Sequence, residues 1–165
     1  MYTPPASPPN RFLGIYMNDQ LASGLVFREV ARRAARANAG TESGRALARV
    51  AAEIAEDIDT FERLMERLGL QRSRMKPRLA IVTERLTRLK LNGRLLAYSP
   101  LSRFVELDFL VMGIEGKKIL WANLADLAGL RAPLPDVDFD ALIERAERQR
   151  AELEPFRCDA GRDAL

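Results

Sequence analysis

The most regular feature of the chain is an apolar repeat between Thr41 and Gly69. Its apolar residues recur at alternating steps of four and three, which places their side chains on one face of an α-helix. They are Leu47, Ala51, Ile54, Ile58, Phe61, Met65 and Leu68. Thr41 is a predicted N-cap, and Gly69 suits the left-handed residue that ends many helices. The repeat therefore predicts a long helix that buries one face against partners.

Weaker versions of the same pattern predict four more helices. Their expected ranges are 18–38, 73–93, 102–127 and 138–152. Asn18 or Asp19 would cap the first, and the short turn at Gly40 would make it the antiparallel neighbour of the 41–69 helix. Two of these helices have a clear apolar stripe that would face the core. The stripe of the 102–127 helix consists of Leu107, Leu110, Ile114, Trp121 and Leu124, and that of the 138–152 helix consists of Phe139, Leu142, Ile143 and Ala146.

Together these helices predict an all-α fold, an up-down-up-down four-helix bundle with a short fifth C-terminal helix. A chain of 165 residues is long enough for one domain with a real core. The expected organisation is a disordered proline-rich arm over 1–16, the bundle over 17–130, a linker and fifth helix over 131–155, and a frayed tail over 156–165.

Composition excludes several classes of protein. The chain has no histidine, which removes histidine-based catalytic triads and ordinary zinc sites. Its one cysteine, Cys158, cannot form an internal disulfide. The N-terminal segment does not resemble a secretory signal, and no uninterrupted apolar run reaches the length of a transmembrane helix. We therefore expect a cytoplasmic protein without a transmembrane segment.

The stretch FVELDFLVMGIEGKKILW, Phe104 to Trp121, is apolar but contains two glycines and several acids. Each glycine costs about 1 kcal/mol against alanine inside a helix, so we expect another helix or the Trp121 ring to approach Gly113 and Gly116 closely. Asp108 and Glu115 share a face and form a predicted polar seam that fixes helix register, neutralised by arginines such as Arg85 or Arg88. The glycines do not form a phosphate-binding loop, which needs a strand-to-helix turn.

The order and length of the helices resemble the ferritin-like superfamily, and EIAEDIDTFERLMERLGL, Glu53 to Leu70, looks like the second helix of such proteins. The chain also resembles a group of uncharacterised actinobacterial proteins. That resemblance rests on Met17 to Ala22, Glu53 to Asp57, Arg88 to Leu96 and Leu110 to Trp121. Both resemblances imply a fold rather than an activity.

A ferritin-like site would need a glutamate on each of two helices and a Glu-x-x-His pair on each of the other two. The carboxylates available for such a site are Glu29, Glu53, Glu56, Glu84 and Glu115. Both histidine places are vacant, and Lys118 follows Glu115 where the last histidine would stand. An iron or manganese site made of carboxylates is therefore the alternative, while surface or ion-paired glutamates without a cofactor are the simpler interpretation.

A second alternative is electrostatic, because nine basic residues and a single acid lie between Arg72 and Arg103. The candidate anion-binding residues are Arg72, Arg74, Lys76, Arg78, Arg85, Arg88, Lys90 and Arg94. Such a segment could bind nucleic acid or an anionic membrane surface. Pairing with acids elsewhere in the bundle is the simpler interpretation.

The sequence thus favours a bundle that binds or scaffolds rather than catalyses. Its expected partners are an unidentified protein and a second copy of the chain, because the apolar side of the 138–152 helix could complete its core in a homodimer.

Overall fold

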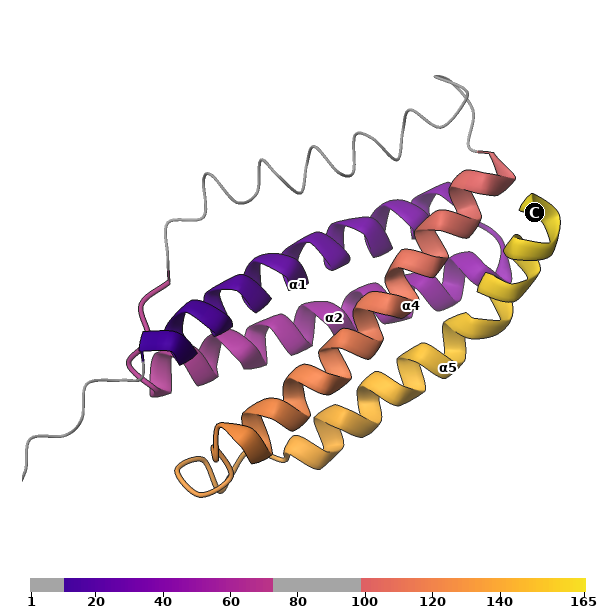
Figure 1. The fold of residues 1–165 in the computed structure, drawn as a ribbon. Helices are drawn as coiled ribbons and strands as arrows, with labels where there is room; N and C mark the ends of the chain where they lie inside the picture. The colour runs from indigo at the N-terminus through magenta and orange to yellow at the C-terminus, as the bar shows by residue number, and fades with distance from the viewer. Residues whose placement is uncertain (1–10, 73–98) are drawn as a thin grey trace, which may run out of the picture.

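The computed structural model describes residues 11–72 and 99–165 (Figure 1). These residues form four α-helices and one π-helical turn. The elements are α1 (Arg11–Ala37), α2 (Glu42–Arg67), α4 (Pro100–Ala122), the π-helical turn η1 (Asn123–Leu127) and α5 (Phe139–Ala164). The helix predicted over 73–93 lies outside the described residues. An all-α fold is confirmed for the part of the chain that the structure describes.

The first hairpin, α1 and α2, forms as the repeat predicts. Thr41 caps α2, accepting a hydrogen bond from the backbone N–H of Gly44 through its Oγ1 at 3.0 Å. Gly40 and Gly69 both take positive φ angles, 83° and 66°, and end α1 and α2 respectively. The apolar repeat from Leu47 to Met65 faces the core. The antiparallel 18–38 and 41–69 neighbours are therefore confirmed.

The second hairpin consists of α4 and α5. Ser99 caps α4, Asp138 caps α5, and the core stripe from Leu107 to Leu124 is buried. These two helices pack more extensively than any other pair among the described elements. Figure 1 shows the two hairpins lying beside each other, α1 with α2 and α4 with α5.

Contacts between the hairpins fix their relative direction. Asn123 at the end of α4 donates a hydrogen bond to Tyr16 near the start of α1, at 3.4 Å. Arg33 near the end of α1 pairs with Glu106 near the start of α4, so these helices run antiparallel. Lys117 pairs with Asp57 on α2, and the Trp121 ring lies 5.7 Å from that of Phe61 one turn further along both helices. Helices α2 and α4 are consequently parallel, and α4 faces both helices of the first hairpin.

Helix α1 begins earlier than the sequence predicted. Residues 11–16, assigned above to a disordered arm, are helical, whereas residues 1–10 lie outside the described part. Asn18 is not an N-cap but a buried residue inside the helix, and its side-chain amide donates to the carbonyls of Gly14 and Gln71. The bond to Gln71 ties the first turns of α1 to the chain after α2 and so favours the early start of the helix.

The last helix was also predicted too short. Instead of ending at residue 152 and fraying over 156–165, α5 has 26 residues and continues to Ala164, with Pro155 inside it. Leu153 and Ala160 are fully buried, and the Phe104 ring of α4 packs near Gly161. This apolar contact packs the C-terminal turns of α5 against α4. None of the described helices is long and apolar enough to cross a membrane.

Candidate functional site

A cavity of about 290 Å³ lies between α1, α2 and α4. Its wall is mostly apolar. The lining residues are Gln20, Leu21, Ser23, Gly24 and Phe27 of α1, Ile54, Asp57, Ile58 and Phe61 of α2, and Phe109, Met112, Gly113, Ile114, Gly116, Lys117, Leu120 and Trp121 of α4. Buried side chains such as Ile58 form the inner wall, and Met112, which is 65% exposed, lies where the cavity reaches the surface.

The two glycines of α4 both line this cavity, but for different reasons. A Cβ atom at position 113 would lie 2.2 Å from Cε1 of Phe27, so only glycine admits that ring. The Phe27 ring stacks in turn on Phe109, with 4.7 Å between the ring centroids. The expected close approach is confirmed at Gly113. At Gly116 the described residues provide no such neighbour, since a Cβ there would meet none of their atoms within 4 Å.

Trp121 is one of the residues that line the cavity. Its side chain is 1% exposed and packs edge-on against Phe61, at an interplanar angle of 63°. Among the described residues its indole Nε1 has no hydrogen-bond acceptor. A buried donor without a partner is uncommon in proteins and costs free energy. The described core therefore contains a buried hydrogen-bond donor without an acceptor at Trp121.

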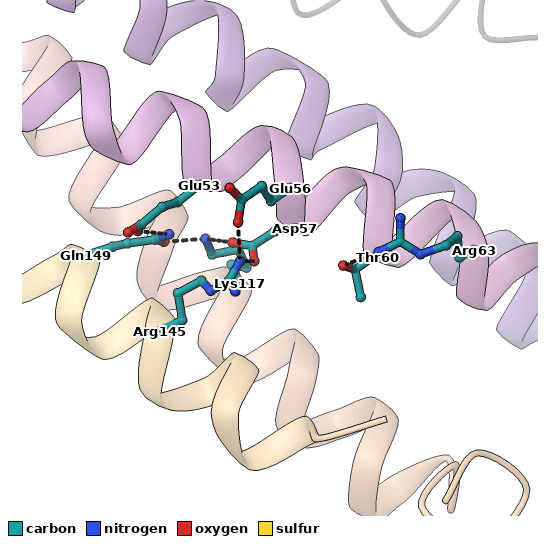
Figure 2. A network of polar contacts seen from close by, with 8 residues as sticks. All are labelled: Glu53, Glu56, Asp57, Thr60, Arg63, Lys117, Arg145 and Gln149. Atoms are coloured by element: carbon teal, nitrogen blue, oxygen red, sulfur yellow. Dashed lines mark hydrogen bonds and ion pairs between the residues drawn. The ribbon is translucent and has the colours of Figure 1, made fainter. Parts of the chain in front are cut away.

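Charged side chains from α2, α4 and α5 meet beside the cavity and form the central network (Figure 2). Its members are Glu53, Glu56 and Asp57 of α2, Lys117 of α4, and Arg145 and Gln149 of α5. Lys117 donates to the Asp57 carboxylate and to the Gln149 carbonyl oxygen. Gln149 donates to Glu53 at 2.7 Å, and Arg145 bridges Glu56 and Asp57 at 3.1 and 3.2 Å.

The centre of this network is removed from water. The Asp57 residue is 3% exposed, Gln149 is 1% exposed, and the Lys117 side chain retains 15% exposure. Burial lowers the pKa of the Lys117 ammonium, although the Asp57 carboxylate opposes that shift. Lys117 and Asp57 each have a further hydrogen bond to α5, through Gln149 and Arg145. The pair therefore links α2, α4 and α5 and can fix their relative register.

A second set of ion pairs, the α4–α5 ladder, runs along the other side of α4. Asp108 pairs with Arg157 at 3.2 Å, and Glu115 pairs with Lys118 at 2.8 Å and with Arg150 at 3.7 Å. Glu147 of α5 completes the ladder between Lys118 and Arg150. The structure thus places the predicted seam residues Asp108 and Glu115 against α5. Arg85 and Arg88, the neutralising residues named from the sequence, lie outside the described residues.

The ladder depresses carboxylate pKa values. Arg150 and then Lys118 lower the pKa of Glu147 to about 2, and Arg157 lowers the pKa of Glu154 to about 2. Hydrogen bonds from the cations to the ionised carboxylates are the main cause.

The candidate metal ligands do not come together in the part of the chain that is described. Glu29 pairs with Arg28 and Arg32 on the surface, Glu53 accepts from Gln149, Glu56 pairs with Arg145, and Glu115 belongs to the ladder. Within the described ranges no three carboxylate or thiol side chains form a metal-binding group. Glu84 lies outside those ranges.

Of the candidate anion-binding residues, Arg72 is the one that the structure describes. It pairs with Glu62 at 2.9 Å and with Glu66 at 3.3 Å, both on α2. The others, Arg74, Lys76, Arg78, Arg85, Arg88, Lys90 and Arg94, lie outside the described residues.

Sequence reasoning missed Asp57, Lys117 and Gln149 as a group. Asp57 directly precedes Ile58 of the core repeat, and Gln149 follows Leu142 and Ala146 at helical spacing on α5. That spacing indicated two polar residues close to apolar faces. Their meeting depends on how α5 packs against α2, which no local pattern specified.

Comparison with known proteins identifies no relative: no family model, curated protein or solved structure matches this chain. The fold and the cavity define it as a four-helix all-α protein within the described residues, and its function has to be argued from the site itself.

Proposed function

We propose that this protein binds a small apolar molecule in the cavity between α1, α2 and α4. The observation that carries the proposal is an apolar cavity of about 290 Å³ bounded by three helices. Ligand sites are typically concave and mostly apolar, with a few polar groups, and they lie preferentially between the helices of bundles. Non-catalytic binding agrees with the chain's lack of histidine.

The cavity volume limits the size of the ligand. An apolar cavity of about 150 Å³ binds benzene, so one about twice as large accommodates roughly twelve non-hydrogen atoms. A molecule of one substituted ring or two fused rings has that size. Of the polar lining residues, Gln20 is partly buried and Ser23 is exposed, which would leave the inner wall to the apolar body of the ligand.

Isothermal titration calorimetry with naphthalene would test this proposal. The expected result is a saturable binding isotherm with a negative heat-capacity change, the signature of buried apolar surface. In the Gly116→Leu variant the new side chain fills part of the cavity, and binding should weaken at least tenfold. Ile119→Ser, an exposed position on the same helix outside the cavity, is the matched control and should bind normally.

Absence of binding to the wild-type protein would overturn the proposal. So would unchanged affinity in Gly116→Leu, because the ligand would then bind elsewhere.

The finer structural assignments from the sequence also stay proposals. Helix lengths of 27, 26, 23 and 26 residues and antiparallel hairpins support a ferritin-like relation. The iron or manganese alternative has less support, because the described candidates Glu29, Glu53, Glu56 and Glu115 already have cationic or amide partners. A cytoplasmic location and a homodimer remain predictions from sequence.

A further inference from the structure

We infer that the ligand of this cavity is an uncharged aromatic molecule, whose ring packs against the side chains of Phe27 and Phe109. This inference rests on the proposed function and names the chemical class of the ligand. It starts from the two aromatic residues that line the cavity and are half-buried rather than fully buried.

Phe27 of α1 and Phe109 of α4 form the accessible aromatic part of the cavity wall. Side chains project outward from a helix and cover its backbone, so the surface that each residue contributes to the cavity belongs to its ring. The ring centroids are 4.7 Å apart and the rings are tilted by 32°, which makes them one aromatic surface across two helices. Phe61 and Trp121 also line the cavity but are only 4% and 1% exposed, so they contribute little to this surface.

Gly113 holds this aromatic surface in place. A Cβ atom at position 113 would lie 2.2 Å from Cε1 of Phe27, so the ring can approach α4 only because the residue is glycine. The Phe27 ring is thus enclosed by the backbone of α4 on one side and packs against Phe109 on another. A surface fixed in this way loses little side-chain entropy when a ligand binds to it.

An aromatic ligand gains contacts here that a saturated ligand of the same shape does not. Aromatic rings attract each other in tilted, offset and edge-to-face arrangements beyond the effect of buried area. Met112, which is 65% exposed, lies where the cavity reaches the surface, and its thioether sulfur also packs favourably against aromatic rings. The accessible lining residues Phe27, Phe109 and Met112 therefore all favour an aromatic ring.

The charges around the cavity argue against an ionic ligand. Asp57 and Lys117 are the charged residues of the described lining, and they pair with each other. Each is also bound by a residue of α5, Asp57 by Arg145 and Lys117 by Gln149. A charged ligand group would have to break these bonds or be buried without a partner, which is costly. An uncharged ring needs no rearrangement of the central network.

The described residues offer two other candidate sites, and both are weaker. The lone cysteine, Cys158, already contacts Glu154 and Arg157. Exposed apolar residues such as Phe12 and Ile119 form no defined pocket, and nothing in the structure indicates what would cover them. The cavity is distinguished by combining a bounded volume with accessible aromatic rings.

Two probes with the same carbon skeleton, toluene and methylcyclohexane, separate aromatic contacts from burial of apolar surface. Both are smaller than the ligand that the cavity volume allows, so size does not distinguish them. Methylcyclohexane is the more hydrophobic, so burial alone would favour it. Dividing each association constant by the water-to-hexadecane partition coefficient of the probe removes this difference.

The corrected constant should be about fivefold larger for toluene, since an aromatic pair contributes about 1 kcal/mol beyond area burial. Both probes are volatile, so headspace gas chromatography over a solution of the full chain measures both constants.

Matched variants assign the preference to the aromatic surface. Phe109→Leu keeps an apolar side chain but removes one ring, so the ratio of the corrected constants should fall at least twofold. Ile58→Val changes the aliphatic part of the wall, so both constants should change while their ratio is kept. Circular dichroism confirms that each variant is folded. An unchanged ratio in Phe109→Leu would overturn the inference.

A spectroscopic readout on the unmodified protein locates the probe and does not depend on the folding of a variant. The ring current of a bound aromatic molecule shifts the resonances of nearby protons. Ile54, Ile58 and Ile114 line the cavity and carry methyl groups that report on it. Their methyl signals should move further on addition of toluene than on addition of methylcyclohexane.

The outcomes separate the two proposals. If both probes bind in the cavity with equal corrected constants, the cavity binds apolar molecules but the aromatic inference is wrong. If neither probe binds, or if toluene binds without moving the three isoleucine signals, the proposed function itself fails.

Discussion

The two sides of α4 meet the rest of the molecule in different ways. Toward α5 the helix carries the α4–α5 ladder, a series of ion pairs from Asp108–Arg157 to Glu115–Arg150. Toward α1 and α2 it presents Gly113, Gly116 and Trp121 to the cavity. Ion pairs link α4 to α5, while the cavity lies between the hairpins. The ladder and the proposed binding site are therefore on opposite faces of one helix.

The central network lies at the boundary between these two sides. Lys117 is part of the cavity wall, yet its ammonium group reaches Gln149 on α5. A change in the network should therefore affect the packing of the hairpins against each other, whereas a change in the ladder should affect α5 on α4 alone. The following variants test that distinction.

The largest effect is expected from Asp57→Ala. It leaves Lys117 buried without its carboxylate, and breaking a buried ion pair typically costs about 3–5 kcal/mol of unfolding free energy. Urea denaturation measures this loss. Glu56→Ala is the control, because Glu56 contacts the same Arg145 from an exposed position and should cost less than about 1 kcal/mol.

Replacing both buried partners sharpens the result. Asp57→Leu combined with Lys117→Met removes the charges together, so part of the lost stability should return, less the cost of leaving the buried Gln149 oxygen without its donor. Equal stability of Asp57→Ala and Glu56→Ala would show that the central network does not hold the hairpins together.

The next largest change in stability is expected from substitutions at Gly113 and Gly116, on the face of α4 that lines the cavity. Gly113→Ala places a methyl group against the Phe27 ring and should lower the unfolding free energy by about 1–2 kcal/mol, the cost of overpacking less the gain in helix propensity. Gly116→Ala meets no atom of the described residues within 4 Å and should raise the unfolding free energy by up to about 1 kcal/mol. Thermal and urea unfolding compare the pair. Equal stability of the two would mean that Phe27 is not tightly held.

The difference between these glycines shows what the sequence could predict. Helix propensity treats Gly113 and Gly116 alike, so both were expected to face a close neighbour. Only the position of Phe27 on α1 distinguishes them. The periodic stripes of α2 and α4 were predicted correctly, because which face of a helix is buried depends on residue spacing within that helix and not on its neighbours.

Tertiary contacts likewise explain the errors at the chain's ends. The last helix was expected to end near residue 152 because the residues that follow are mostly polar. Leu153 and Ala160 are nevertheless buried, and the helix continues past them. Asn18 was assigned to a helix cap because its side chain commonly plays that role, but here it bonds to Gln71 across the hairpin. The cavity could not be predicted at all, since it requires three helices in their final arrangement.

The smallest change in stability is expected when the carboxylates of the α4–α5 ladder are protonated at low pH. Glu147 has its pKa lowered to about 2 in the folded protein, whereas an unfolded glutamate titrates near its ordinary value of 4.5. Between these values the unfolded state binds more protons, so the stability from this ladder is complete above about pH 4.5 and is lost as the pH falls toward 2.

Melting temperatures from pH 5 to pH 2 should follow that course, and Glu147→Gln should flatten it. Glu144→Gln, an exposed acid on α5 with only a 3.9 Å contact to Arg148, should not. If Glu147→Gln kept the wild-type pH dependence, the acid sensitivity would not arise from Glu147, and its ion pairs with Lys118 and Arg150 would contribute little to the position of α5 on α4.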